Sequence, residues 1–133
     1  MVCESMAGAV EFLQDLSETL LQFCESRLLC DTEVLTDTKS FWVHSVVLAA
    51  GSQSLRKAFV SSCSSAKSCH FRVQLTGCDV VAVEAVLRFL YTGQLTSQHK
   101  KLTDDVKILL VCRMLGVPIE KLHHALLKFD RTL

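Results

Sequence analysis

The strongest constraint on the fold comes from residues 29–59, where a hairpin pattern runs directly into short apolar helices. Thr32–Thr36 is rich in β-branched residues, which predicts a strand. The polar segment 37–40 predicts a turn, and Phe41–Val43 predicts the returning strand. Val46–Ala50 is too short for an independent helix, so it must be held by burial. This segment therefore requires a small sheet that packs directly against helices.

Small polar residues and glycine predict where the helices of this segment begin and end. Gly51 is expected to take the left-handed position that ends the first helix. Ser52 is expected to cap a second helix that runs through Phe59. His44 lies between the hairpin and the first helix, where a buried ring can donate one hydrogen bond and accept another.

The rest of the chain contains one further strand and several helices, by the spacing of its apolar residues. Apolar and polar residues alternate in Phe71–Leu75, which predicts a strand. Helical spacing occurs in Val10–Phe23 and in Ile119–Phe129. It also occurs in the segment from the N-cap Asp79 through Tyr91, and in Val106–Leu115 after the N-cap Thr103. Strands early and helices late predict a single α+β domain over residues 1–133, mainly helical with a small three-stranded sheet on one side. We expect residues 1–8 to form a flexible arm, 9–28 the N-terminal helix and 29–129 the core, with a loop at Ser61–Ser68.

Composition narrows the possible partners. Fourteen basic residues balance 14 acidic ones, so no basic field exists to hold phosphates, and we expect no direct contact with nucleic acid. The seven cysteines are odd in number, no signal-peptide pattern precedes them, and no run approaches the ~20 apolar residues of a membrane span. We therefore expect free thiols in a reducing compartment and no membrane. Half of the residues are hydrophobic, which favours a self-association face.

The sequence gives little support for catalysis or for a bound cofactor. It has no Gly-rich phosphate loop, no HExxH and no Gly-x-Ser-x-Gly turn, so we expect no enzyme. Cys63 and the pair Cys69–His70 lack a CxxC partner, so we expect neither a metal nor a cofactor. Three further cysteines are expected to behave as small hydrophobes: Cys30, Cys78 and Cys112.

Four groups of residues, in order along the chain, resemble the BTB/POZ domain family over roughly Phe12 to Phe129. They are Leu29–Asp31 with His44 thirteen positions after Asp31; Val46 to Ser52 followed by Phe59; Val83–Leu90 followed by Tyr91, Thr92 and Gly93; and a helix to Leu115 followed by Val117 and Leu122. The resemblance implies the BTB/POZ fold, a protein-interaction module, and structural roles for His44, Tyr91 and Gly93.

The resemblance further implies homodimerisation through the N-terminal helix. The matching positions are the apolar residues Phe12, Leu13, Leu16, Leu20, Leu21 and Phe23. Such an interface would bury apolar surface that one chain cannot cover alone.

Two departures from the family pattern bear on the choice of partner. Many zinc-finger-linked members carry a basic residue directly after the structural histidine, resembling a buried pair with the aspartate that matches Asp31; here that position is Ser45. Asp31 should therefore find backbone amides, another base or water. Cullin-binding members usually carry a hydrophobic-x-Glu motif soon after the match to Phe59, yet residues 60–70 contain no Glu.

These departures decide which of two functions implied by the resemblance is preferred. The first is a homodimeric module of a zinc-finger-linked transcription regulator in the nucleus, which recruits corepressor-type protein partners. The alternative is a substrate adaptor of a cullin RING ubiquitin ligase, for which the cytoplasm is an alternative location. A cullin partner is disfavoured because the usual Glu is missing.

Overall fold

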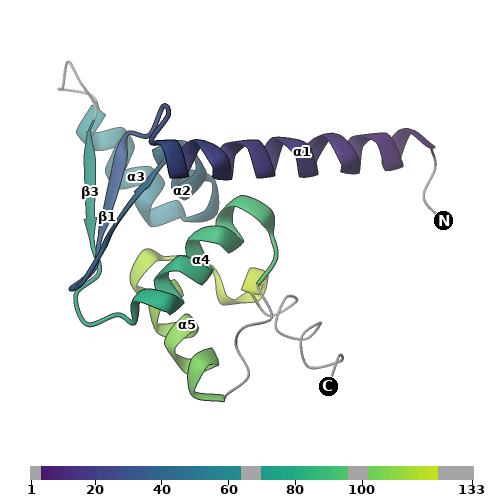
Figure 1. The fold of residues 1–133 in the computed structure, drawn as a ribbon. Helices are drawn as coiled ribbons and strands as arrows, with labels where there is room; N and C mark the ends of the chain where they lie inside the picture. The colour runs from purple at the N-terminus through teal and green to yellow at the C-terminus, as the bar shows by residue number, and fades with distance from the viewer. Residues whose placement is uncertain (1–3, 64–69, 96–101, 123–133) are drawn as a thin grey trace.

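The computed structural model of the protein describes residues 4–63, 70–95 and 102–122, and it has the predicted α+β architecture (Figure 1). Its elements in chain order are α1 (Glu4–Ser26), β1 (Thr32–Leu35), β2 (Ser40–Val43), α2 (Ser45–Gly51), α3 (Gln53–Cys63), β3 (Phe71–Gln74), α4 (Val80–Thr92) and α5 (Leu102–Leu115). The sheet lies at one side of the molecule, and α1 runs from beside it past the other helices (Figure 1).

The sheet has three strands in the order β2-β1-β3, so β1 is the central strand. It pairs antiparallel with β2, where Thr32 lies opposite Val43, and parallel with β3, where Thr32 lies opposite Phe71. Thr36 closes the hairpin turn: its backbone N–H and its hydroxyl donate to the Lys39 carbonyl at 2.8 and 2.7 Å, and its hydroxyl oxygen accepts from the Lys39 N–H at 2.9 Å. The predicted hairpin is therefore confirmed.

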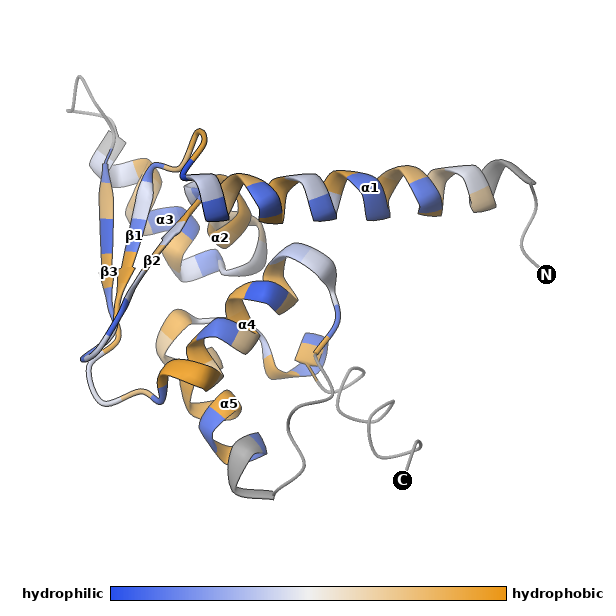
Figure 2. Ribbon diagram, in the orientation of Figure 1, coloured by the Kyte–Doolittle hydropathy of each residue, from blue (hydrophilic) through white to orange (hydrophobic). Residues whose placement is uncertain are grey.

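Helix α4 occupies the centre of the molecule and contacts α1, α2 and α5. Asp79 caps its N-terminus by accepting a hydrogen bond from the Ala82 N–H at 3.1 Å. Gly93 ends it in the left-handed conformation with φ 73°, and the Gly93 N–H donates to the Phe89 carbonyl at 2.7 Å. Hydrophobic residues alternate with hydrophilic ones along α4 and α5 (Figure 2). Side chains that are less than 2% exposed form the centre of the core: Leu48, Leu75, Ile108, Leu115, Leu122, Val34, Val83, Val86, Val111, Thr32, Cys112 and Ser52.

The junction between α2 and α3 confirms one prediction and corrects another. Ser52 caps α3 as predicted, because its hydroxyl oxygen accepts from the Leu55 N–H at 3.2 Å, and the same hydroxyl donates to the Leu115 carbonyl at 2.6 Å. Gly51 was expected in the left-handed conformation, but it is the last residue of α2 and does not have a positive φ. A glycine is favoured at this position for a different reason, because a Cβ atom there would overlap the Leu90 side chain on α4.

Several element boundaries differ from the predicted ones. Helix α1 begins at Glu4, so residues 4–8 are helical where a flexible arm was expected. Helix α3 continues through Cys63 into the predicted loop, and α5 begins at Leu102, which places the expected N-cap Thr103 inside the helix. Residues 119–122 are helical after Pro118, while the remainder of the predicted last helix lies outside the described residues. Across the described ranges, none of the helices combines the length and hydropathy needed to cross a bilayer.

Candidate functional site

Helix α1 carries an apolar face that its own chain leaves largely uncovered. The helix has 23 residues and is therefore about 34 Å long. Near its N-terminal half, Phe12, Leu13 and Leu16 are 68%, 58% and 46% exposed. Nearer its C-terminal end, Leu20 and Leu21 pack against the core. The helix is thus anchored at one end, and its N-terminal half extends beyond the rest of the described chain (Figure 1).

His44 lies between the hairpin and helix α2, and its hydrogen bonds connect this point to helix α4. Its backbone N–H donates to the Tyr91 hydroxyl oxygen at 3.0 Å, and its Nδ1 lies 2.7 Å from the same oxygen. Its Nε2 lies 3.0 Å from the Leu28 carbonyl, which can only accept, so Nε2 carries the proton and Nδ1 accepts from Tyr91. Burial raises the pKa of the Tyr91 hydroxyl well above its usual range. The ring of Phe23 lies 6.5 Å from the His44 ring, between centroids.

Two thiols flank the imidazole of His44. Cys24 Sγ lies 3.8 Å from Nδ1 and Cys30 Sγ lies 3.7 Å from Nε2. Burial raises the pKa of Cys24. Burial is also the main cause that raises the pKa of Cys30 to about 11, and the neighbouring Cys24 is the second cause. Both thiols are therefore protonated near neutral pH and lack the thiolate character of a catalytic cysteine. Of the other candidate ligands in the sequence, Cys69 lies outside the described residues.

The hydrogen-bond partner of Asp31 is Ser45, which stands where many members of the resembled family carry a basic residue. The Ser45 hydroxyl donates to Asp31 Oδ2 at 2.5 Å, and the Ser45 backbone N–H donates to Oδ1 at 2.6 Å. The Thr32 hydroxyl donates to Oδ1 at 3.1 Å. Burial alone would raise the pKa of Asp31, but the Ser45 hydrogen bonds outweigh it and hold that pKa below its usual range. The carboxylate is thus satisfied locally, partly by the backbone amide that the sequence analysis anticipated.

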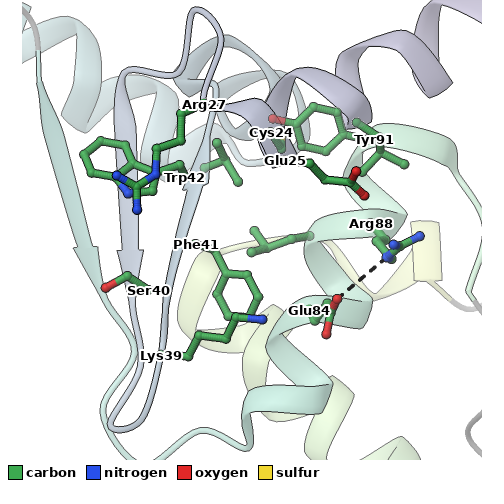
Figure 3. Close-up of a pocket in the computed structure, with 13 residues that line it drawn as sticks. Cys24, Glu25, Arg27, Lys39, Ser40, Phe41, Trp42, Glu84, Arg88 and Tyr91 are labelled. Carbon is green, nitrogen blue, oxygen red and sulfur yellow. Dashed lines mark ion pairs between the residues drawn. The ribbon is translucent and has the colours of Figure 1, made fainter.

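A cleft of about 370 Å³ opens beside this junction, between the end of α1, strand β2 and helix α4 (Figure 3). The Arg27 guanidinium lies 5.2 Å from the centre of the Trp42 ring on its β2 side. Glu84 and Arg88 form an ion pair at 3.9 Å on its α4 side, and Cys24 contributes to the lining. Aromatic surface and charges of both signs suit the recognition of a polypeptide better than that of an anion or a nucleic acid.

The structure brings some predicted residues together and separates others. His44 meets Tyr91, and Asp31 meets Ser45, in both cases across elements that are distant in sequence. His70 is exposed and lies 5.2 Å from Trp42, between ring centroids, while Cys69 lies outside the described residues. The approach of the two thiols to His44 was not predicted from the sequence. Their spacing of six residues was visible, but only the hairpin brings the imidazole between them.

An α+β scaffold that presents an exposed apolar helix and a cleft of mixed polarity defines a protein-interaction module. The family model of the BTB/POZ domain matches residues 20–128, and the chain therefore belongs to the BTB/POZ domain family. The BTB domain of zebrafish PATZ1 shares the fold, with a TM-score of 0.68 at 15% sequence identity. The match covers 92% of this chain and 94% of the PATZ1 chain. BTB domains generally dimerise and bind protein partners.

Relatives of two kinds are similar in sequence. Zinc finger and BTB domain-containing protein 7A of Gallus gallus is 32% identical over 122 residues, which are 85% of this chain and 21% of that protein. Kelch repeat and BTB domain-containing protein 2 of Pongo abelii is 33% identical over 85 residues, 64% of this chain and 13% of that protein. The chain thus spans about a fifth or less of the length of these curated relatives.

Proposed function

We propose that the chain forms a homodimer through the apolar face of α1. The observation that carries this proposal is the exposure of Phe12, Leu13 and Leu16 on a helix whose C-terminal end is already anchored in the core. At 100° per residue these three side chains fall within a sector about 100° wide, which is the width of an interface stripe. Membership of the BTB/POZ family supports the same assembly.

The structure refines which residues test this dimer. Leu20 and Leu21 are partly buried against the core of their own chain, so an Asp there would destabilise the monomer as well as disrupt an interface. Leu13→Asp with Leu16→Asp changes side chains that are exposed in the single chain. We expect the wild-type chain to sediment at micromolar concentration with twice its 14.8 kDa mass, and the double variant to sediment as a monomer.

Val81→Asp provides a control because Val81 is 51% exposed and lies on α4 instead of α1. It adds the same charge to an exposed valine and should leave the dimer intact. A monomeric wild-type chain would reject the proposal. A dimer that persists in the Leu13→Asp/Leu16→Asp variant would show that the interface lies on another face.

We further propose that this dimer serves a transcription regulator of the zinc-finger-linked type in the nucleus and recruits corepressor-type partners. The relative that covers 85% of the chain is a zinc finger and BTB protein, which supports this choice. The absence of Glu from residues 60–70 also favours it over a ligase adaptor. Joining two DNA-binding regions in one dimer would raise their effective concentration on DNA.

The second candidate is a substrate adaptor of a cullin RING ubiquitin ligase, because Kelch repeat and BTB proteins are also among the relatives. A fusion of the chain to a heterologous DNA-binding domain separates the two functions. We expect repression of a reporter gene, and we expect the Leu13→Asp/Leu16→Asp variant to lose that repression. Submicromolar binding of a cullin N-terminal domain together with an unrepressed reporter would establish the adaptor instead. Nuclear staining of the tagged protein tests the proposed location.

A further inference from the structure

Three segments converge on a cluster of soft metal ligands. Cys24 comes from the end of α1, Cys30 from the turn before β1, and His44 from the end of the hairpin. The separations are 3.8 Å between Cys24 Sγ and Nδ1 and 3.7 Å between Cys30 Sγ and Nε2, and one ligand atom from each residue lies within 4.8 Å of the others. In a tetrahedral site with Zn–S of about 2.3 Å and Zn–N of about 2.0 Å, ligand atoms lie about 3.5–3.8 Å apart. The 3.7 Å between Cys30 Sγ and Nε2 already matches this spacing, and the other ligand atoms, which lie within 4.8 Å, need to approach by up to about 1 Å.

We propose that Cys24, Cys30 and His44 bind one Zn²⁺ ion through the two Sγ atoms and Nε2, with water in the fourth position. Each thiol gives up its proton to solvent as it binds, so uptake of one ion releases two protons and no oxidation is involved. Two thiolates and one neutral imidazole suit Zn²⁺ better than the hard ions Mg²⁺ and Ca²⁺. The proposal does not rest on the proposed dimer, because its three ligands are distinct from the exposed residues Phe12, Leu13 and Leu16.

The outer contacts of the cluster favour a bound ion. When Nε2 binds zinc, the proton of the imidazole moves to Nδ1, which lies 2.7 Å from the Tyr91 hydroxyl oxygen. That oxygen then accepts from Nδ1–H and from the His44 backbone N–H, and its own proton is free to donate to the Cys24 sulfur, with which Tyr91 already interacts. A ligating histidine whose second nitrogen is held in this way is the usual arrangement in zinc sites.

Among the described residues, zinc displaces two hydrogen bonds, from Nε2 to the Leu28 carbonyl at 3.0 Å and from the Cys30 thiol to the Phe23 carbonyl at 3.7 Å. The Leu28 carbonyl belongs to a turn in which the flanking residues Arg27 and Leu29 have φ of 58° and 59°, a conformation that non-glycine residues rarely adopt. The Leu28 side chain is 49% exposed, so the turn can shift without disturbing the core. Cys24 also lines the cleft of Figure 3, which gives the ion a path from solvent.

Cobalt provides a direct test because Co²⁺ bound by thiolates gives charge-transfer absorption that free Co²⁺ lacks. The full 133-residue chain, reduced with a phosphine and freed of metal with a chelator, is titrated with Co²⁺ and then with Zn²⁺. We expect the absorption to saturate at one Co²⁺ per chain and to disappear at one Zn²⁺ per chain. In the zinc form, long-range ¹H–¹⁵N spectra should show the proton of His44 on Nδ1 instead of Nε2.

Serine variants locate the site. Cys24→Ser and Cys30→Ser change one atom each, and each should weaken Zn²⁺ binding by more than the roughly 10–100-fold that loss of an outer contact causes. The control variant Cys63→Ser/Cys69→Ser removes two other thiols that the sequence analysis considered as metal ligands. It should bind Zn²⁺ with the same affinity as the wild-type chain. Circular dichroism verifies that every variant is folded. Stoichiometric binding that survives in both Cys24→Ser and Cys30→Ser, binding that is lost in the control, or a wild-type chain that binds no Zn²⁺ would overturn the proposal.

Discussion

Removal of one hydroxyl group, in Tyr91→Phe, tests whether the His44 junction holds the fold together. Phenylalanine keeps the ring in the core, so packing is unchanged to a first approximation. Two buried groups lose their partner, the His44 backbone N–H at 3.0 Å and the His44 Nδ1 at 2.7 Å. An unsatisfied buried polar group costs about 1–3 kcal/mol. For the two groups together we therefore expect the free energy of unfolding to fall by about 2–6 kcal/mol, a large share of the ~5–15 kcal/mol of a typical domain.

Urea denaturation followed by circular dichroism, in a chelating buffer that removes bound metal, measures this loss. The corresponding change in Tm is a fall of roughly 7–21 °C for a chain of this length. Thr92→Val is a matched control, because it removes a hydroxyl from the next residue, where that group donates to the Arg88 carbonyl at the surface at 2.9 Å. It should cost less than about 1 kcal/mol. A Tyr91→Phe variant within about 0.5 kcal/mol of the wild-type chain would refute the reasoning, since surface substitutions reach that value without structural cause.

Other substitutions test the remaining contacts. Ser45→Ala removes the 2.5 Å hydrogen bond to Asp31 and should lower stability by about 1 kcal/mol in urea denaturation, because the Ser45 N–H still serves the carboxylate; an unchanged midpoint would contradict this. Gly93→Ala meets no neighbouring atom and should cost about 1–2 kcal/mol of backbone strain, whereas Gly116→Ala should cost more, because its Cβ would also overlap serine hydroxyls at the α2–α3 junction; equal losses would count against that overlap. Cys112 is fully buried and burial raises its pKa to about 11, so mass spectrometry should detect its alkylation by iodoacetamide at neutral pH only after denaturation.

Local signals in the sequence were enough to place the scaffold. A polar turn between a β-branched segment and the segment Phe41–Val43 predicted the hairpin, and Asp79 marked the start of α4. These signals work because capping and turn formation depend on a few neighbouring residues. For the same reason Ser52 was predicted as an N-cap, although nothing local indicated that its hydroxyl also reaches the Leu115 carbonyl.

The errors arose where tertiary contacts decide what a residue does. Gly51 looked like a helix terminator because glycine commonly adopts a left-handed conformation, yet its small size is needed for the approach of Leu90. Cys30 was treated as a small hydrophobe because no CxxC spacing marks it. Its proximity to Cys24 and His44 depends on the turn at residues 27–29 and on the hairpin, neither of which a spacing rule detects.

The His44 junction and the exposed face of α1 are physically connected. The N-terminal half of α1 projects from the core, so its direction is set by the contacts of its last turns. Those turns include Phe23 and Cys24, which both lie against His44. We therefore expect a change in the junction, whether by Tyr91→Phe or by the proposed ion, to reorient or loosen the helix that carries the proposed interface. Substitutions at Leu13 act on the interface alone, because that side chain lies outside the anchored turns. A loss of dimer without a loss of stability consequently identifies the face, and a loss of both identifies the junction.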